Sequence, residues 1–182
     1  MKRKKIFLVL FPLILGVIIY LIYRSRNLFY FRIIKSHSVF YDFVDDIRIF
    51  AWKYRKIFPL WVVYSLPDGL WLFSFGAALM IDRIFYVFHF FLFTGIYVFM
   101  VFFEFVQKYA GGHGSLIGTY DPLDILFFTI GYVTIAIISN HLRKQKIITE
   151  NDITPINKKI ELIEDFRIIV IFFILAILPT LF

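Results

Sequence analysis

The 182-residue chain contains no cysteine, which excludes disulfide bonds, a thiol nucleophile and thiolate metal sites. Acidic residues are few: 13 Asp and Glu stand against 20 Lys and Arg, a formal net charge of +7. No His-x-x-x-His or Glu-x-x-His pair occurs, and neither a phosphate-binding loop, a Rossmann fingerprint nor a Gly-x-Ser-x-Gly sequence is present. We therefore expect no metal and no cofactor, and we assign no catalytic residue.

Hydrophobic residues, by contrast, make up 60% of the chain and aromatic residues 21%, with 25 Phe and a mean hydropathy of +0.79. This apolar excess is larger than soluble domains carry. Several runs reach the roughly 17–25 residues that cross a bilayer, and helix is the structure that satisfies the backbone there. In so apolar a chain, basic clusters indicate contact with anionic lipid, so we expect a lipid partner and no nucleic acid.

Residues 1–23 resemble a signal peptide, with MKRKK before an apolar run, but no small-residue cleavage site follows. We predict an uncleaved membrane anchor helix. Residues 24–59 mix aromatic and basic side chains, and apolar residues from Phe43 to Tyr54 recur at spacings of three and four. This spacing predicts an interfacial amphipathic helix, with a helical hairpin packed on the bundle as the alternative.

In residues 60–140, the sequence predicts a core of three membrane spans. The first of these begins near SLPDGLW, where Ser65 or Asp68 can cap it, and ends near residue 81. The second covers 84–107, and a glycine-rich loop leads to the third, which opens at Asp121 and ends near 139. Residues 141–182 form a basic loop and a C-terminal membrane helix. The predicted fold is all-α, an integral membrane bundle of about five helices with an interfacial amphipathic helix.

If the spans alternate in direction, five polar residues gather at one face of the membrane. These candidate ligand-binding residues are Asp68, Glu104, Gln107, Asp121 and Asp124. With the N-terminus inside, eleven cations lie on the inner side and nine on the outer side. The positive-inside rule then predicts that the acidic face lies outside.

Each acidic residue also has a purely structural explanation. Asp121 before Pro122, with Asp124 at the third position, fits a helix-capping arrangement; Asp68 can cap its own helix, and Glu104 can pair with Lys108 one turn later. Glu104 differs from the others because it lies inside an apolar span, where an ionisable group is costly. We predict that Glu104 faces the bundle and contacts Gln107 or the backbone of residues 111–121.

Glu104 and Gln107 close one apolar helix, Asp121 and Asp124 open the next, and Gly131 follows seven residues later. This pattern resembles the VanZ-like family over residues 60–139. Two positions depart from it: Gly118 and Phe128 stand where the family usually has an arginine and an asparagine. The resemblance implies a small multi-pass protein of the bacterial plasma membrane with a role in the cell envelope, and it implies no particular reaction. One family member lowers susceptibility to the glycopeptide teicoplanin.

Three functions remain open from the sequence. The acidic cluster can bind, or help to modify, a polar group of an envelope lipid or glycan. A small transporter is the second candidate, although it needs polar groups throughout the membrane depth. A structural or assembly subunit, docking a partner through residues 24–56, is the third.

Overall fold

A computed structural model describes residues 2–24, 35, 38–112, 119–145 and 154–177. All regular structure in these residues is helical, which confirms the all-α prediction. The elements in chain order are α1 (Lys2–Tyr23), α3 (Ser38–Lys53), the 3₁₀ turn η1 (Arg55–Ile57), α4 (Leu60–Tyr64), α5 (Leu66–Met80), α6 (Tyr86–Ala110), α7 (Pro122–Lys144) and α8 (Pro155–Ile177). The central part of the glycine-rich loop, including Gly118, lies outside the described residues.

The predicted number of helices was too low, because the described residues form seven α-helices. One unpredicted helix is α4, which the chain separates from α5 at Ser65. Pro67 explains the separation, since its ring nitrogen cannot donate the hydrogen bond that would continue α4 into α5. Ser65 is the N-cap residue of α5, as one of the two predicted alternatives had it, but its side chain makes no capping hydrogen bond; Asp68, the other alternative, lies in the first turn.

Among the described residues, three helices are long and apolar enough to cross a membrane: Arg3–Tyr23, Tyr86–Ala110 and Pro122–Lys144. Helix α5, another predicted span, has only 15 residues, or about 22 Å at 1.5 Å per residue. Helix α8 carries six charged residues, from Lys158 to Arg167, before its apolar end. The last part of the predicted fifth span, residues 178–182, lies outside the described residues.

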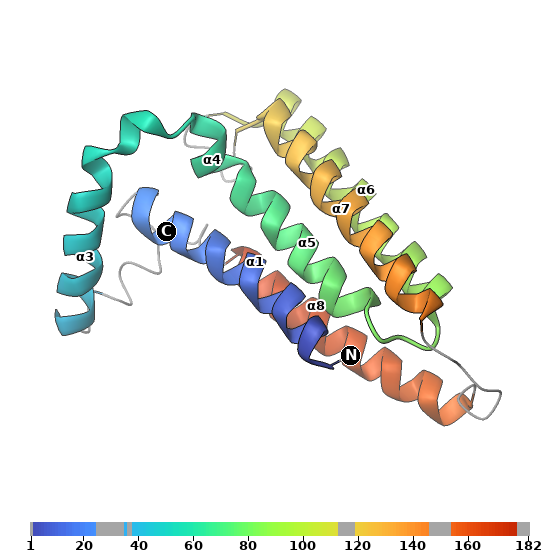
Figure 1. The fold of residues 1–182 in the computed structure, drawn as a ribbon. Helices are drawn as coiled ribbons and strands as arrows, with labels where there is room; N and C mark the ends of the chain where they lie inside the picture. Colours follow the sequence, from blue (N-terminus) through green and yellow to red (C-terminus); the bar gives the residue numbers. More distant parts are fainter. Residues whose placement is uncertain (1, 25–34, 36–37, 113–118, 146–153, 178–182) are drawn as a thin grey trace.

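Helix α5 forms the centre of the bundle, with α1 on one side and α7 on the other, and with further contacts to α6 and α8 (Figure 1). Its core side chains include Leu72 and Phe75, which are almost fully buried. Phe75 packs on the rings of Phe93 from α6 and Phe172 from α8. Four longer helices contact α5, and none of its residues is exposed.

Glycines allow α5 and α7 to approach closely. A Cβ on Gly131 would lie 2.5 Å from the carbonyl oxygen of Gly69, and a Cβ on Gly69 would lie 2.6 Å from that of Phe127. Small residues at such crossings let helix backbones pack in direct contact. This contact holds the first turn of α5 against the first turns of α7, where the predicted acidic residues lie.

Helix α3 is attached to the C-terminal end of α1 (Figure 1). The buried Arg48 guanidinium donates to the carbonyl oxygens of Leu21 and Arg24, and the Trp52 indole donates to that of Ile22. These are carbonyls that the helix end leaves without intrahelical partners. The large apolar side chains exposed on α3 are Phe40, Phe43, Ile47, Ile49, Phe50 and Trp52. The predicted amphipathic helix is therefore present, and its place at a membrane interface stays a prediction.

Candidate functional site

The predicted acidic residues meet at the end of the bundle where α6 ends and where α5 and α7 begin. Glu104 has a side chain that faces the bundle, with 6% of the residue exposed. Electrostatic interactions connect it with Asp124, Asp68 and Asp121. We call these four carboxylates the acidic cluster. The structure thus brings together residues from three helices that alternation of the chain predicted to lie at one depth.

Asp121 has the capping role that was one of its predicted alternatives. It is the N-cap of α7, and its Oδ1 accepts from the backbone N–H of Leu123 at 2.9 Å. In a capping box, the residue three positions later would bond back to the N-cap amide. Here the Asp121 amide instead interacts with the Glu104 carboxylate of α6, as predicted for Glu104. Asp124 therefore does not bond back to the N-cap amide, and its carboxylate faces the hydroxyl of Ser65.

Asp68 is held by two residues that the sequence analysis missed. The hydroxyl of Tyr20 donates to Asp68 Oδ1 at 3.1 Å and accepts from Arg24 at 3.2 Å. Arg24 also donates to the carbonyl oxygen of Tyr64 at 3.4 Å. Its positive charge acts on both Asp68 and Asp124. The sequence contained one signal for the contact between Tyr20 and Arg24, because these residues are four positions apart and share a helix face.

Glu104 has no positively charged neighbour comparable to Arg24 among the described residues. The charged groups that act on it most strongly are carboxylates. Lys108, its predicted ion-pair partner, lies over the ring of Tyr120 at 5.5 Å. Gln107 is half-buried, and its side chain makes no hydrogen bond within the described part of the chain. Gln107 is thus the one predicted residue that the structure does not connect to the cluster.

Several polar atoms of the site retain hydrogen-bonding capacity. Ser65 is fully buried, and Glu104 nearly so. Ser65 Oγ, Glu104 Oε2 and Asp124 Oδ1 have no hydrogen bond of standard geometry to any described residue. Ser65 and Asp124 approach each other without reaching that geometry. Buried polar atoms are normally paired, so these atoms indicate a site that can accept an additional donor.

A second polar cluster lies at the opposite end of the bundle, around Arg83. The buried Arg83 guanidinium lies 2.6 Å from Glu164 Oε2 and 3.0 Å from Asp165 Oδ1, and it donates to the carbonyl oxygen of Leu79. These contacts connect the turn between α5 and α6 to α8. The sequence predicted a tight polar turn here, and Asp82 with a φ of 65° confirms it.

His89 completes this second cluster. Its Nδ1 lies 2.8 Å from the carbonyl oxygen of Phe85, and its Nε2 lies 2.8 Å from Asp165 Oδ2. Glu161 accepts the backbone N–H groups of Ile84 and Phe85, at 2.7 and 3.2 Å. Because Arg83 and His89 both lie within ion-pair distance of Asp165, we interpret this cluster as structural. It binds the charged half of α8 to the bundle.

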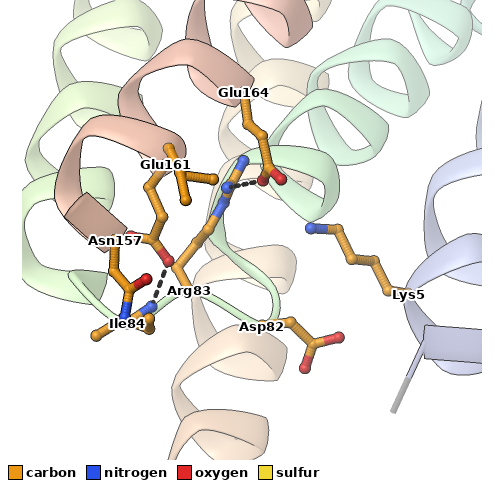
Figure 2. Close-up of a pocket in the computed structure, with 8 residues that line it drawn as sticks. Lys5, Asp82, Arg83, Ile84, Asn157, Glu161 and Glu164 are labelled. Carbon is orange, nitrogen blue, oxygen red and sulfur yellow. Dashed lines mark hydrogen bonds and ion pairs between the residues drawn. The ribbon is translucent and has the colours of Figure 1, made fainter. Parts of the chain in front are cut away.

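A pocket of about 360 Å³ opens beside the Arg83 cluster. Figure 2 shows Lys5 and Glu164 facing each other across it, and Lys5 Nζ donates to the carbonyl oxygen of Ile81 at 2.9 Å. The lining residues are Lys5, Asp82, Arg83, Ile84, Asn157, Ile160, Glu161 and Glu164. The charges around it are mixed, so the pocket does not select one sign of ligand. The acidic cluster is the stronger candidate site.

Comparison with known proteins adds no further assignment: no family model, curated protein or solved structure matches the chain. Within the described residues, no group of three or more His, Asp or Glu side chains is arranged to hold a metal ion.

Proposed function

We propose that the chain is a multi-pass membrane protein of the cell envelope that binds a polar group through the acidic cluster. The ligand would be a lipid headgroup or glycan that supplies hydrogen-bond donors or a positive charge. One observation carries the proposal: Glu104 is buried, and the described charged groups that act on it most strongly are other carboxylates.

The electrostatics of the cluster favour a ligand of this kind. Removing a carboxylate from water is costly unless donors or opposite charges replace its hydration. Four carboxylates share the site; the charge of Arg24 acts on Asp68 and Asp124, whereas the charged groups named for Glu104 are carboxylates. An ammonium group or a set of sugar hydroxyls would supply what Glu104 lacks. The resemblance to the VanZ-like family supports a role in the bacterial plasma membrane, and the predicted topology puts the site at the outer leaflet.

The distribution of ionisable residues favours binding over transport. Asp, Glu, Lys and Arg are absent from residues 69–80 of α5, 86–103 of α6 and 125–142 of α7, and the buried His89 of α6 pairs with Asp165 in the Arg83 cluster. The centre of the bundle is filled instead by apolar side chains such as Leu72, Phe93 and Ile135. A proton or ion relay needs ionisable groups within the membrane depth. The exposed apolar face of α3 leaves an assembly role as the second candidate.

The proposal can be tested by lipid binding to the purified protein. Vesicles containing phosphatidylethanolamine, phosphatidylglycerol or a lipid-linked cell-wall precursor would be compared by co-flotation. We expect one of them to bind, with at least tenfold weaker binding to Glu104→Gln. Asp46→Asn, an exposed change on α3, is the matched control and should bind normally. Equal binding by the wild type and Glu104→Gln would overturn the proposal.

Glu104→Leu separates folding from binding. Glutamine retains an oxygen that can accept from the Asp121 amide, whereas leucine has none. We expect Glu104→Gln to unfold at the same temperature as the wild type and Glu104→Leu to unfold earlier.

A further inference from the structure

We propose that Tyr20, Tyr64, Asp68 and Asp124 form a binding site for an organic cation, which the side chain of Arg24 occupies in this structure. The ligand class is an alkylammonium or guanidinium group. The inference rests on the proposed function and deepens it, since it names the chemistry of the group that the acidic cluster would bind.

Aromatic rings supply the first part of this site. The Arg24 guanidinium carbon lies 4.6 Å from the ring centroid of Tyr20 and 4.7 Å from that of Tyr64. Both distances are within the roughly 6 Å at which ring faces attract cations. Tyr20 belongs to α1 and Tyr64 to α4, so tertiary packing places the two rings around one position. Two rings that meet at one cation resemble the aromatic sites that recognise substituted ammonium groups.

Carboxylates supply the second part. The Tyr20 hydroxyl donates to Asp68 and accepts from Arg24, so it links the cation to the carboxylate. Asp124 is the other carboxylate on which Arg24 acts. With Glu104 and Asp121 nearby, the site repels anions. Aromatic faces do not ligate hard metal ions, which prefer oxygen ligands. The remaining class is a cation with apolar substituents.

The hydrogen bonds that hold the Arg24 side chain between these rings and carboxylates are long. Its two side-chain hydrogen bonds measure 3.2 and 3.4 Å, at or beyond the long end of the usual range. Its buried Nε has no hydrogen-bond partner among the described residues, and its contact with Asp68 runs through Tyr20. A small ammonium group could approach Asp68 directly, which the guanidinium of Arg24 does not do. Arg24 would therefore compete with a ligand for this site.

Removal of Arg24 should leave a site that a soluble cation can fill. We expect Arg24→Ala to unfold at a lower temperature than the wild type, and millimolar methylguanidinium or ethanolamine to restore at least half of the difference. Both cations should bind Arg24→Ala at least tenfold more tightly than the wild type, measured by calorimetry. Arg55→Ala is the matched control, because Arg55 lies 6.0 Å from the ring of Tyr23 without a carboxylate partner among the described residues. It should show no rescue.

A second variant covers the case in which Arg24→Ala does not fold. Arg24→Gln keeps donors for Tyr64 and Tyr20 without the charge, and it should show the same rescue. Absence of rescue in every folded Arg24 variant would overturn the inference. Vesicles of phosphatidylethanolamine, compared with free ethanolamine, distinguish a lipid headgroup from a soluble amine. Rescue without lipid binding by the wild type would retain the cation site and reject the proposed function. Lipid binding by the wild type without rescue of the Arg24 variants would retain the proposed function and reject the cation site.

Discussion

Gly131→Ala should push α5 and α7 apart. The added Cβ would lie 2.5 Å from the carbonyl oxygen of Gly69 and 3.3 Å from its carbonyl carbon. Ordinary contact begins at 3.4 Å, so the oxygen alone requires a displacement of 3.4 − 2.5 = 0.9 Å. The opposing atoms belong to a helix backbone and cannot rotate away as a side chain would. Overpacking of this kind costs about 1–3 kcal/mol of unfolding free energy.

The matched control is Gly95→Ala in α6, where the new Cβ would meet no atom within 4 Å. Both variants gain the same preference of alanine for helix, up to about 1 kcal/mol. The difference between them therefore isolates the steric cost, which we expect to be about 1–3 kcal/mol. Unfolding would be followed by circular dichroism in one detergent for both proteins. Identical unfolding curves would refute the close contact between α5 and α7.

Three further predictions concern the rest of the molecule. Asp165→Asn should lower the unfolding free energy by about 3–5 kcal/mol, because it leaves the buried Arg83 without its buried partner. Glu164→Gln, at a side chain that is 54% exposed, should cost under about 1 kcal/mol. Equal losses in the two variants would contradict the conclusion that Asp165 is the main partner of Arg83. Arg48→Ala should increase hydrogen exchange throughout α3, since it removes the bonds to the end of α1; unchanged exchange would show that other contacts hold α3. Tyr109→Cys, at a position that is 84% exposed, introduces the sole thiol of the chain and should react with an impermeant maleimide on intact cells; reaction only after lysis would reverse the predicted orientation.

The sequence predicted best those elements whose signals are local. Helices α6 and α7 follow from long apolar runs, and the start of α7 follows from Asp121 and Pro122 at the cap. The depth of Glu104 followed from its place one turn inside an apolar helix. These signals need no knowledge of which helices are neighbours.

The contacts that depend on packing could not be predicted in this way. Asp68 looked like a helix cap, whereas its partner Tyr20 lies 48 residues away on α1. Arg83 looked like part of a surface turn, yet it pairs with α8 more than 80 residues later. Apolar character alone did not distinguish α5, which is surrounded by protein, from the helices that surround it.

The shortness of α5 has an electrical consequence. Polar clusters lie at both of its ends, about 22 Å apart, whereas the hydrocarbon core of a bilayer is about 30 Å thick. In a bilayer, water that hydrates these clusters would carry the potential of each aqueous phase inward. A membrane voltage would then fall over about 22 Å instead of about 30 Å, which raises the local field about 1.4-fold. The acidic cluster would lie at the edge of this field, so a cation that enters it from the adjacent water would cross little of the voltage.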